Sequence, residues 1–381
     1  MMKIKKRFGM KKNIKLCFLF LFLPCYLFGQ ASLYEIKYNG SGSGTSEFFK
    51  ILDTCYNRFN NVFHFDEDGP GFKYPVSLFT DVDAYKAYVT EKTGTAEPKS
   101  ETVFLRYSAI SRSEVAAVVS AENKNTFIRQ LFIQYIYSFI AAPPAWLVNG
   151  FSLYFEQYPD LYESPWLEPA KSLYLNENKR IPVTLMLEAT KDTYTSDVFL
   201  PQAWLFVSFL VEGPYSRNSR FLYDTLQIAV NESYSDEDPF INYYEKWIDD
   251  EQFQKDYDSF VRNLHSVKED LSAGINAYSE KRIQDAVVLF KRVLDGRLEN
   301  YTAAYYLALC AYSQKNYKEA DSWYKKAMHY GADPALVNWG LGACAYADKR
   351  YEEGKVYLLK AKQLDEASYG KRVDDLIMQM P

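Results

Sequence analysis

The feature that most limits how this chain can fold is an internal repeat in its C-terminal third. Similar residues recur at a spacing of 34, since 308 − 274 and 342 − 308 are both 34. Two columns hold small residues and a third holds larger ones: Gly274, Ala308 and Gly342; Ala286, Ala320 and Gly354; Phe290, Tyr324 and Leu358. Such a period is typical of helical repeats, each of which buries its apolar face only against a neighbour. The pattern therefore predicts an all-α solenoid.

The repeat resembles the tetratricopeptide repeat (TPR), a helix pair in which Gly or Ala at the crossing allows close approach. The segments Tyr-Lys-Glu-Ala at 317–320 and Tyr-Glu-Glu-Gly at 351–354 are similar to the family's mid-repeat signature. Ile283 departs from it in the first repeat, and the family's proline is displaced to Pro334 or missing. The resemblance implies a unit over 267–381, with repeats at 267–300, 301–334 and 335–368 and a capping helix after them.

Aromatic side chains are predicted on the concave face, which the first helix of each repeat presents. The candidate positions are Leu271, Tyr305 and Trp339 in one column and Tyr278, Tyr312 and Tyr346 in the other. The resemblance implies that the five aromatic residues among them contact a protein or peptide partner in this groove. The alternative is that the tyrosines only pack between neighbouring helices. Cys310 and Cys344 are equivalent positions, and helices about 8–10 Å apart are too distant for an unstrained disulfide.

A second stretch, residues 125–156, is predicted to form two amphipathic helices separated by Pro143-Pro144. Apolar residues recur at helical spacing in its first half: Phe127, Ile128, Leu131, Phe132, Tyr135, Ile136 and Phe139. Its second half contains Trp-Leu-Val-Asn-Gly, beginning at Trp146. A helix, a short break and a helix with this motif resembles the active-site region of the gluzincin (peptidase MA-like) metallopeptidases. The alternative is a helical hairpin that matches by chance.

The residues that perform the chemistry of that family are replaced in this chain. The resemblance places the two zinc-binding histidines at Arg129 and Ile133, the general base at Gln130 and the third zinc ligand at Asn149. Arginine stays protonated and has no lone pair to offer, and isoleucine has no donor atom. These substitutions predict a degenerate peptidase domain that has no catalytic residues and binds no metal or other cofactor.

The segment around this motif, residues 32–265, is predicted to be an α+β domain, mostly helical with a small mixed sheet and zincin-like by resemblance. A helix is expected at 46–63, and strands are expected at 74–79, 102–107 and 115–119. Asp81 or Asp83 is expected to cap a short helix after the first of these strands. The apolar run at 114–119 is interpreted as a buried strand, with the substrate-holding edge strand of the gluzincin lobe as the alternative.

The N-terminus, residues 1–31, is predicted to be a secretory signal peptide. A basic segment precedes an apolar run from Leu16 to Phe28, and cleavage is expected after Gly29 or Ala31. The run is short for a membrane span. We therefore expect an exported protein that is periplasmic or associated with the cell envelope, with an uncleaved membrane anchor as the alternative.

Composition narrows the classes of function. A formal net charge of −5 provides no basic field for nucleic acid, and the three histidines are scattered along the chain. We expect a non-catalytic protein that binds or scaffolds a protein or peptide partner in the bacterial cell envelope. One alternative is a hydrolase that uses Glu156 with another acid. Another is glycan binding, suggested by 33 tyrosines and 6 tryptophans; an exposed aromatic platform favours it, and a buried aromatic core counts against it.

Overall fold

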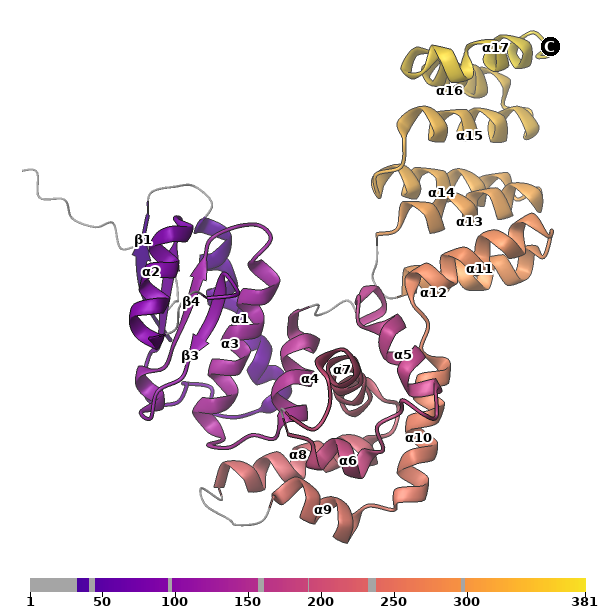
Figure 1. Cartoon of the computed structure of the whole chain (residues 1–381). Helices are drawn as coiled ribbons and strands as arrows, with labels where there is room; N and C mark the ends of the chain where they lie inside the picture. Colours follow the sequence, from indigo (N-terminus) through magenta and orange to yellow (C-terminus); the bar gives the residue numbers. More distant parts are fainter. Residues whose placement is uncertain are drawn as a thin grey trace, which may run out of the picture.

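The computed structural model of the chain describes residues 33–40, 45–94, 98–156, 161–190, 192–231, 238–295 and 299–381. Within these ranges the chain forms seventeen α-helices and one four-stranded mixed sheet (Figure 1). The prediction of an α-rich chain with a small mixed sheet is therefore confirmed. The predicted signal peptide lies outside the described residues. None of the helices in the described ranges has the length and apolar character needed to cross a membrane.

The sheet has the strand order β1-β2-β4-β3. Its strands are β1 (Tyr34–Asn39), β2 (Tyr74–Phe79), β3 (Thr102–Leu105) and β4 (Glu114–Val118). The first, second and fourth strands run parallel, and β3 pairs with β4 in the antiparallel direction at the edge. All residues of β4 are buried, because the strand lies between two others and its side chains pack into the clusters on both faces of the sheet. The interpretation of this run as a buried strand is confirmed, and the edge positions belong to β1 and β3.

Strand β1 is missing from the sequence-based prediction. Its sequence, Tyr-Glu-Ile-Lys-Tyr-Asn, alternates apolar and polar residues, with Tyr34 buried and Glu35, Lys37 and Asn39 exposed. Alternation of this kind indicates a strand with one buried face, so the signal was present. The other three strands agree with the predicted ranges to within two residues at each end.

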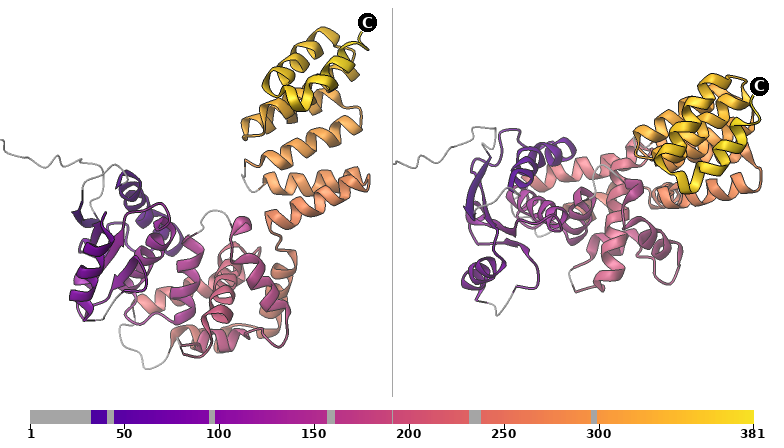
Figure 2. Two further views of the ribbon diagram at one scale, coloured as in Figure 1. Left: turned by 45° about the horizontal axis from the view of Figure 1, so that its top comes forward. Right: turned by 90° about the horizontal axis from the view of Figure 1, so that it is seen from above.

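Helices cover both faces of the sheet (Figure 2). The helices concerned are α1 (Thr45–Phe63), α2 (Val82–Thr93) and α3 (Lys124–Phe139). Val76 and Leu78 of β2 belong to the large core beneath α1 and α3, whereas Phe79 belongs to a smaller cluster beneath α2. Asp81 caps α2, because its carboxylate accepts a hydrogen bond from the Ala84 amide at 2.7 Å. The cap is therefore the first of the two predicted candidates.

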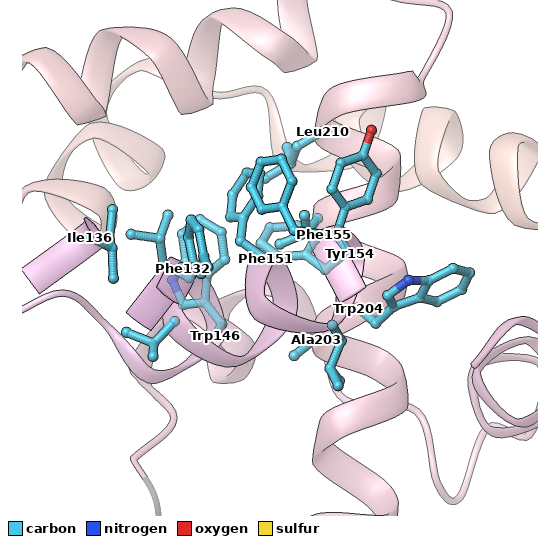
Figure 3. Packing of buried hydrophobic residues seen from close by; sticks show 14 of the residues in the cluster. Phe132, Ile136, Trp146, Phe151, Tyr154, Phe155, Ala203, Trp204 and Leu210 are labelled. Carbon is cyan, nitrogen blue, oxygen red and sulfur yellow. The ribbon is translucent and has the colours of Figure 1, made fainter. Parts of the chain in front are cut away.

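The large core is centred on two further helices, α4 (Ala145–Glu156) and α7 (Ser196–Glu212), which are buried along most of their length. The chain between α3 and α4 contains Pro143-Pro144, so the predicted break is confirmed. The two central helices cross at Gly150, where a Cβ atom would lie 2.4 Å from the carbonyl oxygen of Ala203. Only glycine permits this approach, and aromatic rings fill the space on either side of the crossing (Figure 3).

The remaining helices of the N-terminal part complete the same core. They are α5 (Leu167–Leu175), α6 (Val183–Glu188), α8 (Ser216–Asn231), α9 (Pro239–Trp247) and α10 (Asp250–Asn263). Trp146 of α4 is fully buried and packs against Phe206 of α7 and Phe240 of α9, with ring centroids 5.2 and 5.4 Å apart. The large apolar cluster includes residues from Tyr34 to Leu264, so one face of the sheet and these helices share a core, and the other face packs against α2.

The C-terminal part is a stack of helical hairpins (Figure 1). Its helices are α11 (Val267–Ser279), α12 (Ile283–Asp295), α13 (Tyr301–Ser313), α14 (Tyr317–His329), α15 (Pro334–Ala347), α16 (Tyr351–Leu364) and α17 (Glu366–Ile377). Each hairpin turns through a left-handed lysine: Lys281, Lys315 and Lys349 have φ of 62°, 62° and 61°. Since 315 − 281 and 349 − 315 are both 34, the sequence period is also the period of the backbone.

The small residues of the repeat face large ones across each hairpin. A Cβ atom on Gly274 would lie 2.7 Å from the ring of Phe290, and one on Gly342 would lie 2.6 Å from Leu358. Contact between neighbouring hairpins is equally close at Gly340, where a Cβ atom would lie 2.5 Å from the ring of Tyr324. The columns of small residues in the sequence therefore mark positions where the helices approach closely, and Gly340, which lies outside these columns, marks another.

The junction between the two parts is held by α5. Ser266 begins α11 with a capping box, in which its hydroxyl accepts from the Glu269 amide at 3.0 Å. The same hydroxyl donates to Glu168 of α5. Lys171 of α5 donates to the carbonyl oxygen of Leu264 at 2.7 Å. Helix α5 therefore contacts the chain on both sides of the point where the core ends and the hairpins begin.

Candidate functional site

The helix pair α3–α4 forms the first candidate site, at the positions that resemble the gluzincin motif. Arg129 of α3 forms an ion pair with Glu156 at the end of α4, with Nε and Oε2 3.6 Å apart and the Glu156 side chain only 12% exposed. Burial raises the pKa of Glu156, the Arg129 guanidinium lowers it, and the net direction is upward. Arg129, at the position of the first histidine, therefore joins α3 and α4 through an ion pair.

The other three residues of the motif have separate contacts. Gln130 accepts a hydrogen bond from the Phe104 amide at 2.9 Å and so ties α3 to the edge strand β3. Ile133 is partly buried against the large core. Asn149 donates to the carbonyl oxygen of Ala145, one turn earlier in α4, at 2.8 Å. Each of the four side chains therefore has a structural contact, and the hydrogen bonds of Gln130 and Asn149 go to backbone groups in different directions.

The groups that usually perform metal or nucleophilic chemistry are dispersed or buried. Within the described ranges, no three His, Cys, Asp or Glu side chains are grouped so as to hold a metal ion. The free thiols of Cys55, Cys310 and Cys344 are buried, and burial raises their pKa to about 12, about 11 and about 12. These thiols stay protonated at neutral pH and are therefore poor nucleophiles.

The first helices of the hairpins carry the second candidate site, the predicted aromatic residues. Tyr312 packs edge-on against Tyr317 with ring centroids 5.7 Å apart, and Tyr346 packs in the same way against Tyr351 at 5.8 Å. These two pairs are related by the repeat. Tyr312 is 37% exposed, whereas the other four predicted residues are partly buried. Tyr312 and Tyr346 therefore contact the second helix of their own hairpin and still present part of their rings to solvent, whereas Tyr278 packs against Tyr306 of the next hairpin at 5.6 Å.

The other column is covered in part by the C-terminal helix. Trp339 of α15 packs against Tyr369 of α17 with ring centroids 5.8 Å apart, and the guanidinium of Arg372 lies 4.5 Å from the Trp339 ring. Tyr305 packs against Tyr324 at 5.6 Å, and burial is the largest cause that raises its pKa to about 12. Trp339 therefore anchors the C-terminal helix.

Sequence reasoning missed Tyr369 and Arg372, because α17 does not keep the repeat spacing. It also missed a pocket in the N-terminal part, formed where α8, α9 and α10 meet, with a volume of about 460 Å³. Arg217, Arg220 and Trp247 are among its lining residues. An available signal for this pocket was the pair of arginines, Arg217 and Arg220, which follow a Gly-Pro turn at 213–214.

Compared with known proteins, the chain matches no family model, and no curated protein is significantly similar to it. What the molecule does must therefore follow from the chemistry and geometry of its own residues.

Proposed function

We propose that the chain is an exported, non-catalytic binding protein whose hairpin stack holds a protein or peptide partner in the bacterial cell envelope. In this proposal residues 32–265 are a zincin-like domain that has lost its zinc site. Residues 267–381 are three tetratricopeptide repeats with a capping helix. The observation that carries the proposal is the set of aromatic side chains at equivalent positions on successive first helices.

The geometry of the hairpin stack supports its assignment as tetratricopeptide repeats. The three hairpins turn through lysines spaced by 34 residues and close with equivalent backbone hydrogen bonds. The amides of Arg282, Asn316 and Arg350 donate to carbonyl oxygens five residues earlier, at 2.8, 2.9 and 2.8 Å. Stacks of this kind commonly use the face of their first helices for binding, and partly exposed tyrosines provide large contact area at low entropic cost.

The chemistry of the α3–α4 site supports a non-catalytic role. The Arg129 guanidinium is permanently charged, so it cannot ligate a metal ion, and it faces the carboxylate of Glu156. Gln130 cannot act as a general base, and its side-chain oxygen is occupied by the Phe104 amide. The ion pair and the Gln130 hydrogen bond instead tie α3 to α4 and to the edge strand.

The proposed role is tested by recovering partners from the native envelope with matched variants. The groove variant is Tyr312→Ala with Tyr346→Ala. The control is Val288→Ala with Val356→Ala, which removes two side chains that are 58% and 66% exposed on the second helices α12 and α16. After crosslinking and mass spectrometry, we expect a protein that wild type and control recover and that the groove variant recovers about tenfold less. Equal recovery by all three proteins would contradict the proposal.

Export and loss of catalysis need their own measurements. N-terminal sequencing of the protein from a secreting host is expected to show a chain that begins just after Gly29 or Ala31. An intact N-terminus in the membrane fraction would indicate an anchor instead. Zinc analysis of the purified protein and hydrolysis assays on casein are expected to be negative, and one equivalent of tightly bound zinc with chelator-sensitive activity would overturn the non-catalytic proposal.

The aromatic content by itself does not favour glycan binding, because packing accounts for most of it. In the N-terminal part, fully buried rings include Phe59, Phe63, Tyr74, Phe132 and Trp146. The aromatic side chains there that remain exposed include Tyr162, Tyr215 and Trp247. Only Trp247 of these three lines the pocket between α8, α9 and α10.

A further inference from the structure

The pocket between α8, α9 and α10 has a rigid floor built around a buried carboxylate. Asp256 is 3% exposed and accepts two hydrogen bonds from Arg217, at 2.7 and 2.6 Å. It also accepts from Asn218 at 3.0 Å and from Gln252 at 2.9 Å. Burial raises the pKa of Asp256, but these hydrogen bonds more than offset it and the net pKa is lowered. The ionised carboxylate therefore fixes three residues that line the pocket.

Unused hydrogen-bond donors face the pocket from its two arginines. Arg217 uses two N–H groups for Asp256, and its side chain is 54% exposed. Arg220 is 75% exposed, and its Nη2 atom lies 3.7 Å from Asp224, beyond hydrogen-bonding distance. A guanidinium has five N–H donors in a planar fork that matches a carboxylate. Of the nearby acids, Asp224 accepts from Tyr243 and forms a loose ion pair with Arg220, and Asp249 caps α10.

The charge of the lining limits the ligand to a weak anion. Two arginines and one aspartate, Asp249, line the pocket. Asp256 lies beneath and balances the charge of Arg217, so these four residues sum to zero, and Arg220, 3.7 Å from Asp224, is the cation with which a ligand's carboxylate can pair. A phosphate ester with two negative charges would be poorly balanced here, whereas a single carboxylate is well matched.

The exposed indole of Trp247 indicates that the ligand also has a ring that can stack on it. Trp247 is 65% exposed, in contrast to the fully buried Trp146. The Lys246 ammonium lies 5.1 Å from the centre of the indole ring, and the exposed part of the indole suits a ligand ring that is apolar on one side and hydroxylated on the other, because the hydroxyls can remain in water. A wholly apolar side chain would gain more from an enclosed recess. Tyr243 and Gln252 place further polar groups around the same space.

We propose that this pocket binds a sugar acid, with the pyranose ring on Trp247 and the carboxylate on Arg217 and Arg220. Its volume of about 460 Å³ is sufficient for one or two sugar residues. The site is separate from the aromatic groove of the hairpins, so it gives the N-terminal part a binding role that does not depend on the groove proposal.

The test compares sugars that differ only in the carboxylate. Binding of glucuronic and galacturonic acid to the purified full-length protein is measured by calorimetry, with glucose and galactose as neutral counterparts. We expect millimolar or tighter binding of at least one acid and about tenfold weaker binding of its neutral counterpart. A polymer of the same acid, measured in parallel, distinguishes a free sugar from a polysaccharide as the source.

Matched variants connect the binding to the pocket. Trp247→Ala and Arg220→Ala are each expected to weaken binding of the acid about tenfold or more, and Arg220→Lys less, because lysine keeps the charge but lacks the fork. Tyr162→Ala, which removes an exposed ring outside the pocket, is the control. Melting temperatures of both pocket variants are expected to be close to that of wild type, which would show that the loss of binding is not caused by unfolding.

The proposal would be overturned if no binding were detected at sugar-acid concentrations about 10-fold above the expected millimolar Kd. It would also be overturned by equal affinity for an acid and its neutral counterpart, or by unchanged affinity of the Trp247→Ala protein for the acid. Tighter binding of a nucleoside monophosphate, or of an acetylated dipeptide with a free carboxyl end, would also replace the sugar acid by another ligand class.

Discussion

The N-terminal part and the hairpin stack bury their apolar side chains in different ways. The large cluster of the N-terminal part extends from Tyr34 to Leu264, and it is built by helices distant in sequence, such as α4 and α7, which approach closely at Gly150. In the hairpin stack the apolar residues form several smaller clusters, each drawn from neighbouring helices. Damage to the first core is therefore expected to spread through the whole N-terminal part, whereas damage to a hairpin is expected to stay local.

The largest effect is expected from placing the same extra methyl group in the two regions. Gly150→Ala puts a Cβ atom 2.4 Å from the backbone oxygen of Ala203, so α4 and α7 must separate. We expect a loss of about 3 kcal/mol or more in the free energy of unfolding. Gly274→Ala meets the far end of the Phe290 ring, which can move, and we expect about 1–2 kcal/mol.

Thermal melts followed by circular dichroism, together with limited proteolysis, measure both glycine variants. Proteolysis of Gly150→Ala is expected to degrade the N-terminal core before the hairpins and leave a resistant C-terminal fragment. Equal destabilisation by the two substitutions would show that the core and the stack unfold as a single unit, and the expected contrast between them would then be wrong.

A smaller effect is expected at the end of the hairpin stack. Trp339→Ala removes the ring that packs against Tyr369 and lies beneath Arg372. We expect a loss of about 1–3 kcal/mol, less than for a fully buried tryptophan, with faster hydrogen exchange confined to α17 and α15. Tyr312→Ala serves as the comparison, since its ring contacts Tyr317 and not α17. Uniformly faster exchange along the stack would indicate that Trp339 supports more than the C-terminal helix.

A gain in stability is expected at the turns between hairpin helices. Lys315 has a φ of 62°, a conformation that costs a residue with a side chain about 1 kcal/mol relative to glycine. Lys315→Gly is therefore expected to raise the free energy of unfolding by up to about 1 kcal/mol, as judged from urea denaturation. Lys318→Gly, within α14, provides the opposite control and is expected to destabilise by about 1 kcal/mol.

The smallest effect depends on pH and concerns the ion pair of the N-terminal part. The pKa of Glu156 is raised in the folded protein, so the folded state binds this proton more tightly than the unfolded state. Stability from this group is present below the unfolded pKa and is lost as the pH rises through the folded pKa. Glu156→Gln removes the titration, so its stability relative to wild type is expected to increase from about pH 4 upward and then level off. A difference that stays constant between about pH 4 and 8 would contradict this assignment.

Features that depend on local sequence or on the repeat could be predicted, whereas features that depend on how distant helices pack in the N-terminal core could not. The hairpin turns could be placed because their contacts recur with a fixed spacing, and β2 could be placed because its run is apolar and bounded by turns. The ion pair between Arg129 and Glu156 could not be predicted, because it depends on how α3 crosses α4. The pocket at Trp247 was missed for a similar reason, since three helices must meet before its lining residues become neighbours.

The contacts of α5 at the junction have a mechanical consequence. Lys171 holds the carbonyl oxygen of Leu264, and Glu168 receives the hydroxyl of Ser266, so the few residues between α10 and α11 are clamped on both sides. These contacts restrict rotation of the hairpin stack about the junction. A force exerted on the hairpins by a bound partner would pass through α5 to the aromatic core, and the stack would keep its orientation under that force.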